Sequence, residues 1–215
     1  MAVFDLDSTL FTTGPRNFAI LQEFLGEPGR EGLARELAQL RQEEIGWNIQ
    51  DCLRQRGIGD RALWDELRRF WTARFFTDAY VLHDRALPGA AAFVTACHTH
   101  GALIYYLTGR HVGGMELGTV AALRSEGFPF WRGRCVLHLK PSFEMGDAAF
   151  KDDAVADIRS YRGEVVATFE NEPGNANMFL RSFPAALHFL LTTVHSPNAE
   201  PGDPQLIRSP DFIAG

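Results

Sequence analysis

The stretch "AVFDLDST" (Ala2–Thr9) stands at the start of the chain, and it decides how the rest of the sequence is interpreted. Its opening letters, "AVFDL", are typical of a buried strand, yet Asp5 and Asp7 place two carboxylates at the end of that strand. Unpaired charges resist burial. Other parts of the chain or a bound cation must therefore supply positive charge at the end of the first strand.

Further along the chain, short runs with strand composition alternate with helical stretches. The expected strands are residues 102–108, 135–139, 164–169 and 186–193, and the expected helices between them are residues 89–101, 112–127 and 151–163, each closed by glycine. The strands are too continuously apolar to be half exposed, which favours a parallel sheet covered on both faces. The alternation predicts an α/β fold, a Rossmann-like core with a central parallel sheet flanked by helices.

Residues 14–84 interrupt this alternation, because they contain helical segments and no convincing strand. Residues 31–47 and 60–76 carry apolar side chains at three- and four-residue spacing, and Asp60 is suited to cap the second helix. We predict a core of residues 1–13 and 85–215 with an all-helical insertion, residues 14–84. Five aromatic residues of the insertion either form its own core or include one or two that face a substrate: Trp64, Phe70, Trp71, Phe75 and Phe76.

Composition narrows the classes of function. The net charge of −6 over 215 residues speaks against a nucleic acid held by bulk electrostatics, but a small phosphorylated substrate needs only local positive charge. The three cysteines are widely spaced and fit a reducing, cytoplasmic setting. We see no signal peptide and no membrane-spanning run, and expect the Pro- and Gly-rich tail, residues 196–215, to be irregular.

Ligands of a parallel sheet bind beyond the carboxyl ends of its strands. Besides Asp5 and Asp7, the sequence places at that edge a hydroxyl, a glycine, basic side chains and further acids: Thr108, Gly109, Arg110, Lys151, Glu170, Asn171 and Glu172. Acids can share a divalent cation, whereas a hydroxyl, backbone amides and a lysine can hold a phosphate group. Arg110 either contacts the substrate or pairs with a nearby acid, and Lys140 is the rival of Lys151.

Four motifs, "DLDST", "LTGR", a lysine ahead of a helix and an acidic strand end, occur in this order. The set resembles the haloacid dehalogenase (HAD) superfamily, specifically its phosphatase branches, over most of the chain. "FKDDAV" followed by "VVATFEN" also resembles the phosphatase half of polynucleotide kinase-phosphatases, which favours Lys151 over Lys140. In that family the helical insertion is a cap that shapes the substrate pocket.

The resemblance implies a role for each predicted residue. Asp5 would attack phosphorus and form an aspartyl-phosphate, and Asp7 would act as general acid and then as general base. Thr108, Gly109 and Lys151 would hold the phosphoryl oxygens. Mg²⁺ would be bound by the Asp5 carboxylate, the Asp7 backbone carbonyl and an acid of the fourth motif.

Two departures from the family pattern bear on the site. Ser8 occupies a position where many relatives have glycine. In the fourth motif Glu170, Asn171 and Glu172 replace the usual aspartates; Glu170 is the favoured ligand, Asn171 lies close by, and Glu172 is the reserve.

These features predict a Mg²⁺-dependent phosphohydrolase that cleaves a small-molecule phosphate monoester. A phosphomutase or phosphotransferase would use the same pair of aspartates. A protein with the HAD fold that binds a phosphorylated ligand without turnover is the alternative from a different class. The sequence indicates neither the natural substrate nor the oligomeric state.

Overall fold

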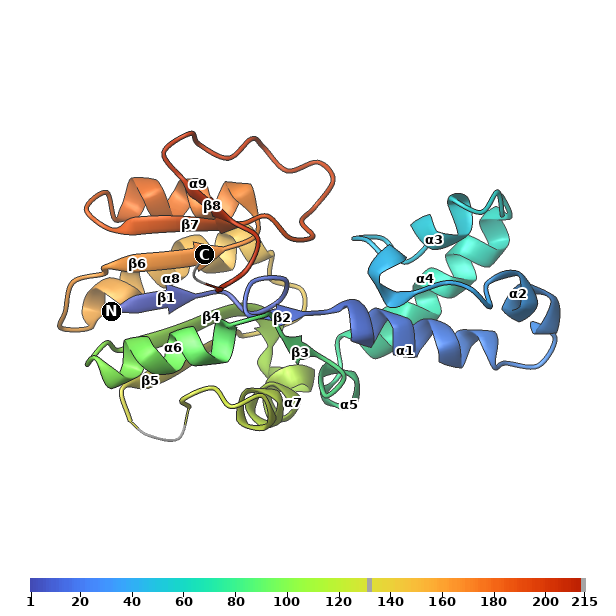
Figure 1. The fold of residues 1–215 in the computed structure, drawn as a ribbon, viewed down its shortest axis with the longest axis horizontal. Helices are drawn as coiled ribbons and strands as arrows, with labels where there is room; N and C mark the ends of the chain where they lie inside the picture. The colour runs from blue at the N-terminus through green and yellow to red at the C-terminus, as the bar shows by residue number, and fades with distance from the viewer. Residues whose placement is uncertain (131–132, 214–215) are drawn as a thin grey trace.

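The structure, a computed structural model, describes residues 1–130 and 133–213. Its main sheet has six parallel strands in the order β5-β4-β1-β6-β7-β8 (Figure 1). These strands are β1 (Ala2–Phe4), β4 (Ile104–His111), β5 (Cys135–Lys140), β6 (Ala167–Glu170), β7 (Leu187–Leu191) and β8 (Ile207–Ser209). The predicted central parallel sheet is therefore confirmed.

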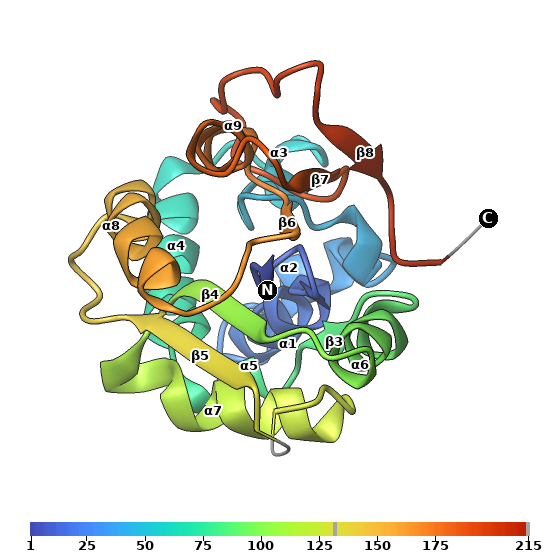
Figure 2. The same cartoon turned by 90° about the vertical axis from the view of Figure 1, so that its left-hand side faces the viewer.

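Helices cover both faces of this sheet (Figure 2). They are α6 (Ala90–Thr99) and α7 (Val112–Ser125) on one face, and α8 (Asp147–Ser160) and α9 (Pro173–Ser182) on the other. Side chains alternate along the strands, so Phe4 and Tyr106 pack with α6 and α7, whereas Val3 and Tyr105 pack with α8 and α9. Because both faces are covered, the central strand β1 and the first part of β4 are apolar and buried on both faces, as is typical of an α/β fold.

The strand order reverses beside β1. The chain adds β4 and β5 on one side of β1, then crosses to place β6 and β7 on the other. In an open parallel sheet, such a reversal opens a crevice at the carboxyl ends of the strands. Asp5 follows β1 and Glu170 ends β6, so both acids lie at this crevice.

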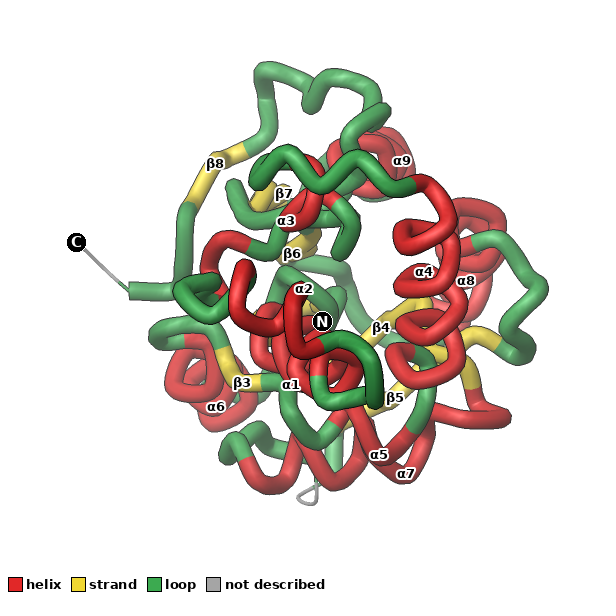
Figure 3. The backbone as a smooth tube through the Cα atoms, turned by 90° about the vertical axis from the view of Figure 1, so that its right-hand side faces the viewer, coloured by secondary structure: helices red, strands yellow, loops and turns green. Residues whose placement is uncertain are grey.

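Residues 14–84 extend beyond the carboxyl edge of the sheet (Figure 1), and their helices lie in front of the strand ends when viewed from that side (Figure 3). They comprise α1 (Gly14–Leu25), α2 (Glu31–Glu36), a 3₁₀ turn (Gln42–Glu44), α3 (Asp51–Arg54), α4 (Arg61–Phe75) and α5 (Asp78–Val81). This helical insertion has its own apolar cluster, built around Leu21, Phe24 and Leu67. No helix of the described residues is long and apolar enough to cross a membrane.

The aromatic residues of the insertion are mostly part of its own core. Trp64, Phe70, Trp71 and Phe75 pack against the insertion's apolar cluster. Phe76 instead packs against the core of the sheet domain, and its ring contacts Phe143 with centroids 4.9 Å apart.

The insertion also differs from the sequence prediction in its second helix. Residues 31–47 do not form one helix, since the chain leaves the helical path after Glu36. The Glu44 carboxylate accepts a hydrogen bond from the Arg41 amide at 2.9 Å and starts a new turn. The break brings Leu37, Leu40 and Ile45 together in the buried cluster. By contrast, Asp60 caps α4 as predicted, accepting from the amides of Ala62 and Leu63.

Three further differences lie in the sheet domain. Helix α8 begins at Asp147, so Lys151 lies in its second turn rather than ahead of the helix. The insertion is connected to the sheet domain by two segments, residues 8–16 and 77–86, which we call its first and second linker. A two-stranded antiparallel ribbon, β2 (Phe11–Thr12) with β3 (Arg85–Ala86), joins these linkers. The tail adds β8 as an edge strand beside β7, so the expectation of an irregular tail is wrong there. Residues 214–215 of the tail lie outside the described residues.

The second linker of the insertion is held tightly against helix α7. Asp78 Oδ1 accepts a hydrogen bond from the Gly118 amide at 2.6 Å. A Cβ atom added at Gly118 would lie 2.4 Å from the Asp78 carbonyl oxygen, a contact that cannot form without moving backbone. Only glycine allows α5 to approach α7 this closely.

We expect Gly118→Ala to lower the free energy of unfolding by about 2 kcal/mol, since overpacking against backbone forces a shift of α5. Gly113→Ala, in the same helix, is the matched control. A Cβ there meets only the His111 ring, at 3.8 Å. This control should be neutral or stabilising by up to about 1 kcal/mol, because alanine favours helix. Chemical denaturation followed by circular dichroism measures both, and equal stabilities would contradict the close packing.

Candidate active site

Asp5, Glu170 and Lys151 form a buried group at the end of the crevice. Lys151 Nζ donates to Asp5 Oδ1 at 2.7 Å and also bonds to Glu170 Oε1. The exposed fractions of the three side chains are 8%, 0% and 5% for Asp5, Glu170 and Lys151. Of the predicted residues, the structure thus brings these three together. The lysine supplies part of the positive charge that the opening strand requires.

One lysine faces two carboxylates, and the pKa values reflect the imbalance. Burial raises the pKa of Asp5 to about 7, and Glu170 adds to the rise while Lys151 opposes it. Burial would lower the pKa of Lys151, but Asp5 and Glu170 outweigh burial and raise it, so the lysine stays charged. When Asp5 is ionised, the group carries one more negative than positive charge.

The three predicted residues of the fourth motif make different contacts. Glu170 lies next to Asp5, whereas both carboxylate oxygens of Glu172 bind Ser196, through its amide at 2.9 Å and its hydroxyl at 2.8 Å. Asn171 accepts from the Thr9 hydroxyl at 3.1 Å and donates to the Val194 carbonyl at 2.8 Å. Glu172 and Asn171 thus fasten loops with their side chains. Glu170 alone of the three meets Asp5.

Asn175 is a site residue that the sequence prediction missed. Its side-chain amide donates to Glu170 Oε1 at 3.0 Å, while the Glu172 backbone amide donates to Glu170 Oε2 at 2.7 Å. Pro173 begins α9, which places Asn175 in the first turn, directed back toward the strand end. The sequence signal for this arrangement was Pro173 in "FENEPGN", because proline is common at the first position of a helix.

Thr108 lies in β4, within the predicted strand of residues 102–108, and Gly109 lies in β4 rather than after it. The register of β4 with β5 shifts between Thr108 and His111, which is typical of a β-bulge. Thr108 is fully buried, and its hydroxyl accepts from the Arg110 amide at 3.2 Å. Gly109 lies against Asp147, because an added Cβ would approach that carboxylate to 2.6 Å.

The structure separates the two candidate lysines. Lys140 donates to Asp147 Oδ1 at 2.6 Å, whereas Lys151 contacts the opening aspartate. Both lysines are buried, but the Asp147 side chain is 62% exposed. Lys151 is therefore the lysine of the acidic site, as the sequence favoured.

Ser8 adopts a left-handed backbone conformation, with φ of 60°. This conformation is the one that glycine adopts without steric cost, so a glycine would fit this position without strain. The Ser8 amide donates to the Phe11 carbonyl at 2.7 Å, and the Thr193 hydroxyl bonds to the Ser8 carbonyl. These contacts hold the tight turn that follows Asp7.

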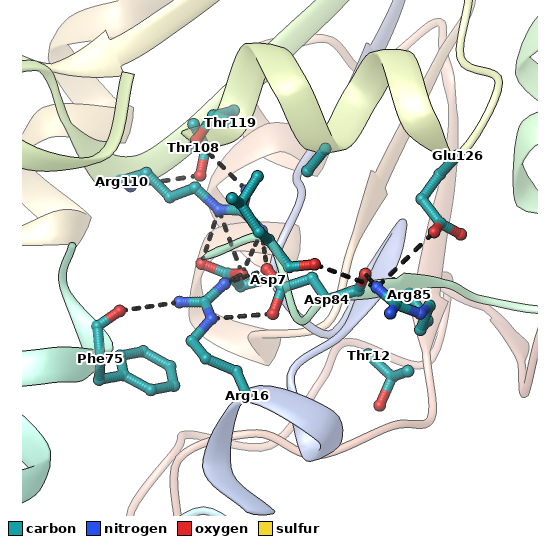
Figure 4. Close-up of polar contacts among 12 residues, drawn as sticks. Asp7, Thr12, Arg16, Phe75, Asp84, Arg85, Thr108, Arg110, Thr119 and Glu126 are labelled. Carbon is teal, nitrogen blue, oxygen red and sulfur yellow. Dashed lines mark hydrogen bonds and ion pairs between the residues drawn. The ribbon is translucent and has the colours of Figure 1, made fainter. Parts of the chain in front are cut away.

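Asp7 belongs to a second charged group, which we call the linker quartet: Asp7, Arg16, Asp84 and Arg110 (Figure 4). Arg16 Nη2 donates to Asp7 at 2.9 Å, and Arg16 Nε donates to Asp84 at 2.8 Å. Arg110 Nη2 donates to Asp7 at 2.6 Å and to Asp84 at 2.7 Å. Each arginine thus bridges both aspartates.

The linker quartet settles how Arg110 is placed. Its side chain is fully buried and bonds to two acids and to the Thr119 hydroxyl at 3.3 Å. Of the two positions considered for Arg110, contact with substrate or pairing with an acid, the geometry shows the second. Burial alone would raise the pKa of Asp7, but Arg110 and Arg16 outweigh it and hold that pKa well below its usual range.

The residues at the crevice fit the predicted Mg²⁺. All candidate ligands are oxygens: the Asp5 carboxylate, the Asp7 backbone carbonyl and the Glu170 carboxylate. Burial raises the pKa of Asp5 and the neighbouring Glu170 adds to the rise, and a cation at this place would neutralise the two carboxylates. Within the described residues, no three acidic, histidine or cysteine side chains form a metal-binding group. Two carboxylates suffice for Mg²⁺, which retains several water ligands.

No family profile matches the sequence, and no curated protein matches it. Solved structures do resemble it. A candidate phosphatase from Clostridium difficile aligns over 97% of this chain and 93% of its own, with a TM-score of 0.59 and 13% identity. Protein Tyrosine Kinase A from Mycobacterium tuberculosis aligns over 97% and 92%, with a TM-score of 0.58 and 14% identity.

A candidate haloacid dehalogenase-like hydrolase from Bacteroides fragilis aligns over 97% of this chain and 95% of its own, with a TM-score of 0.54 and 16% identity. The chain therefore has the fold of the haloacid dehalogenase-like hydrolases, and the resemblance predicted from its motifs is confirmed at the level of the fold. Because a phosphatase and a kinase are both among the similar structures, the reaction must be argued from the site.

Proposed function

We propose that the protein is a Mg²⁺-dependent phosphohydrolase that acts on a small phosphate monoester. The observation that carries this proposal is the buried contact of Lys151 with Asp5 and Glu170 at the crevice beside β1. A nucleophile, a positive charge for phosphoryl oxygens and oxygen ligands for a cation meet there. The four motifs of the sequence converge on the same edge of the sheet.

The proposed reaction begins with Asp5. One of its carboxylate oxygens forms a bond to phosphorus as the bond from phosphorus to the leaving oxygen breaks, which gives an aspartyl-phosphate. Arg16 and Arg110 keep Asp7 ionised in the free protein, so Asp7 first takes up a proton from solvent when the anionic substrate binds beside it. It then passes this proton to the leaving oxygen and later takes one from the water that hydrolyses the intermediate. Lys151, the Thr108 hydroxyl and the Gly109 amide would stabilise negative charge on the phosphoryl oxygens.

Asp5, the carbonyl of Asp7 and Glu170 would hold the metal ion. When bound, Mg²⁺ would neutralise charge on the phosphoryl group and on the carboxylates around it. Lys151 and Asn175 orient Glu170 toward Asp5, and the Glu172 amide fixes the other oxygen of Glu170. Glutamate thus reaches a place where relatives use the shorter aspartate.

The helical insertion would serve as a cap. Its position beyond the strand ends (Figure 3) supports a role in excluding bulk water from the crevice. Phe76 from the insertion side and His111 and Phe143 from the core form a chain of aromatic contacts at their junction, with centroids 4.9 and 5.5 Å from Phe143. These side chains are candidates for contacting the substrate beyond its phosphate.

The test is phosphate release from a panel of phosphorylated metabolites and from 4-nitrophenyl phosphate, with Mg²⁺ and with EDTA. We expect turnover that needs Mg²⁺ and is at least about 100-fold lower in EDTA, since charge neutralisation is the main task in phosphoryl transfer. Turnover that requires a bisphosphate activator would instead indicate a phosphomutase. Binding of a phosphorylated metabolite without turnover would indicate a binding module, and either result would overturn the proposal.

A further inference from the structure

The linker quartet stands where the helical insertion joins the sheet domain. Arg16 lies in the first turn of α1, and Asp84 directly precedes β3, so these two residues come from the two linkers. Asp7 and Arg110 come from the sheet domain, after β1 and near the end of β4. The same four side chains therefore set both the attachment of the insertion and the orientation of Asp7.

Exposure divides the linker quartet into one accessible member and three buried ones. The Asp7 side chain is 32% exposed, whereas those of Arg16, Asp84 and Arg110 are 0% exposed. Asp84 therefore cannot touch a substrate in this arrangement. It can act only through the arginines that also bind Asp7.

The hydrogen bonds to the two oxygens of Asp7 are unequal. Oδ1 accepts from Arg16 Nη2 at 2.9 Å and from Arg110 Nη2 at 2.6 Å, with Arg110 Nε at 3.2 Å. The bond recorded to Oδ2 comes from Arg110 Nε, at 3.2 Å. Asp7 is thus anchored by Oδ1, and its Oδ2 retains lone-pair capacity for a proton.

Asp84 shares the two guanidinium groups with Asp7, because the Nη2 atoms of Arg16 and Arg110 donate to both aspartates and Arg16 Nε donates to Asp84. Two buried arginines with a single aspartate would be undercompensated, and both would turn toward Asp7. Two guanidinium groups chelating Asp7 would then occupy Oδ2 as well as Oδ1.

We propose that Asp84 is a positioning residue for phosphoryl transfer, which keeps Oδ2 of Asp7 available by holding the two arginines. This inference rests on the proposed function. In the step concerned, an Asp5 oxygen bonds to phosphorus and the leaving oxygen departs with the electron pair of its bond. Asp7 Oδ2 takes up a proton from solvent as the anionic substrate binds and passes it to the leaving oxygen, so the demand on Asp84 grows with the basicity of the leaving group.

The test compares kcat/KM for 4-nitrophenyl phosphate and 4-methoxyphenyl phosphate in Asp84→Asn. The two esters are alike in size, but the methoxyphenol is the more basic leaving group and depends more on a proton donor. We expect kcat/KM to fall about 100-fold for the methoxy ester and about 10-fold or less for the nitro ester. Asp84→Glu should restore much of the kcat/KM lost for the methoxy ester.

Two further variants separate positioning from folding. Arg16→Gln with Asp84→Asn removes one charge of each sign and keeps the quartet neutral, which guards against a single variant that fails to fold. Asp78→Asn, in the same linker, removes a carboxylate that contacts the Gly118 amide, and it should leave the ratio of the two kcat/KM values unchanged. Circular dichroism reports the folded fraction of each.

Equal losses for both esters in Asp84→Asn, matching its loss of folded protein, would overturn the positioning role and leave the proposed function intact. An Asp78→Asn ratio that changes as much as that of Asp84→Asn would also overturn it. If the unmodified protein releases phosphate from neither ester, the proposed function fails, and the inference fails with it.

Discussion

Asp5→Asn is expected to abolish phosphate release, by about 10³-fold or more, because the amide cannot attack phosphorus. The same variant should be more stable than the unmodified protein when no metal is present. Asp5 is buried with Glu170, and Lys151 compensates only one of these two carboxylates. Removing one negative charge balances the group.

The direction of the stability change follows from linkage. The folded pKa of Asp5, about 7, lies above its unfolded value of 3.8, so the folded protein binds a proton that the unfolded chain has released. The contribution of the Asp5 carboxyl to the free energy of unfolding is greatest below pH 3.8 and is lost as the pH rises through about 7. At pH 8 in EDTA, Asp5→Asn should raise the free energy of unfolding by roughly 1–3 kcal/mol. This is less than the full difference between the folded and unfolded pKa values of Asp5 would imply.

Denaturation curves at several pH values, recorded in EDTA and in Mg²⁺, check this expectation. Mg²⁺ should stabilise the unmodified protein more than the variant, since binding to the folded state shifts the unfolding equilibrium. The matched control is Asp157→Asn. Asp157 lies on the outer part of α8, and its carboxylate accepts a hydrogen bond from the Tyr105 hydroxyl. This control should lower stability and leave the Mg²⁺ effect in place. A variant Asp5→Asn that keeps its turnover would contradict the assignment of the nucleophile.

The sheet and the acidic site could be predicted from the sequence because their signals are local. The strands that were predicted are largely apolar runs, and the acids of the site follow two of those runs directly in "AVFDLD" and "VVATFE". Parallel strands align their carboxyl ends, so residues far apart in the sequence were expected at one edge. Lys151 was found on a weaker signal, yet it meets Asp5 across 146 residues.

The linker quartet could not be predicted in this way. Arg16 and Asp84 are 68 residues apart. Each is an isolated charged residue in a linker, and no sequence motif marks either of them. Their contact depends on how the insertion leaves and rejoins the sheet, which no short pattern encodes. Strand β8 was missed for a related reason: "LIRS" is brief and flanked by proline, and only pairing with β7 gives it strand structure.

Lys151→Met is expected to cost both turnover and stability. Methionine keeps the length and apolar character of the side chain but leaves Asp5 and Glu170 facing each other without a counter-charge. Breaking a buried ion pair costs about 3–5 kcal/mol. The loss of the Lys151 charge, which would face the phosphoryl oxygens, should lower kcat by about 10²–10³-fold.

Lys140→Met is the matched control, because both lysines are buried and each donates to a carboxylate. The partner of Lys140, Asp147, is 62% exposed and can be solvated when the lysine is removed. We therefore expect Lys140→Met to cost no more than about 1 kcal/mol. Adding Glu170→Gln to Lys151→Met should recover part of the stability, since the group returns to a single net negative charge, and it should recover none of the turnover. Equal stability losses for the two lysines would show that the acids at the crevice are compensated by something other than Lys151.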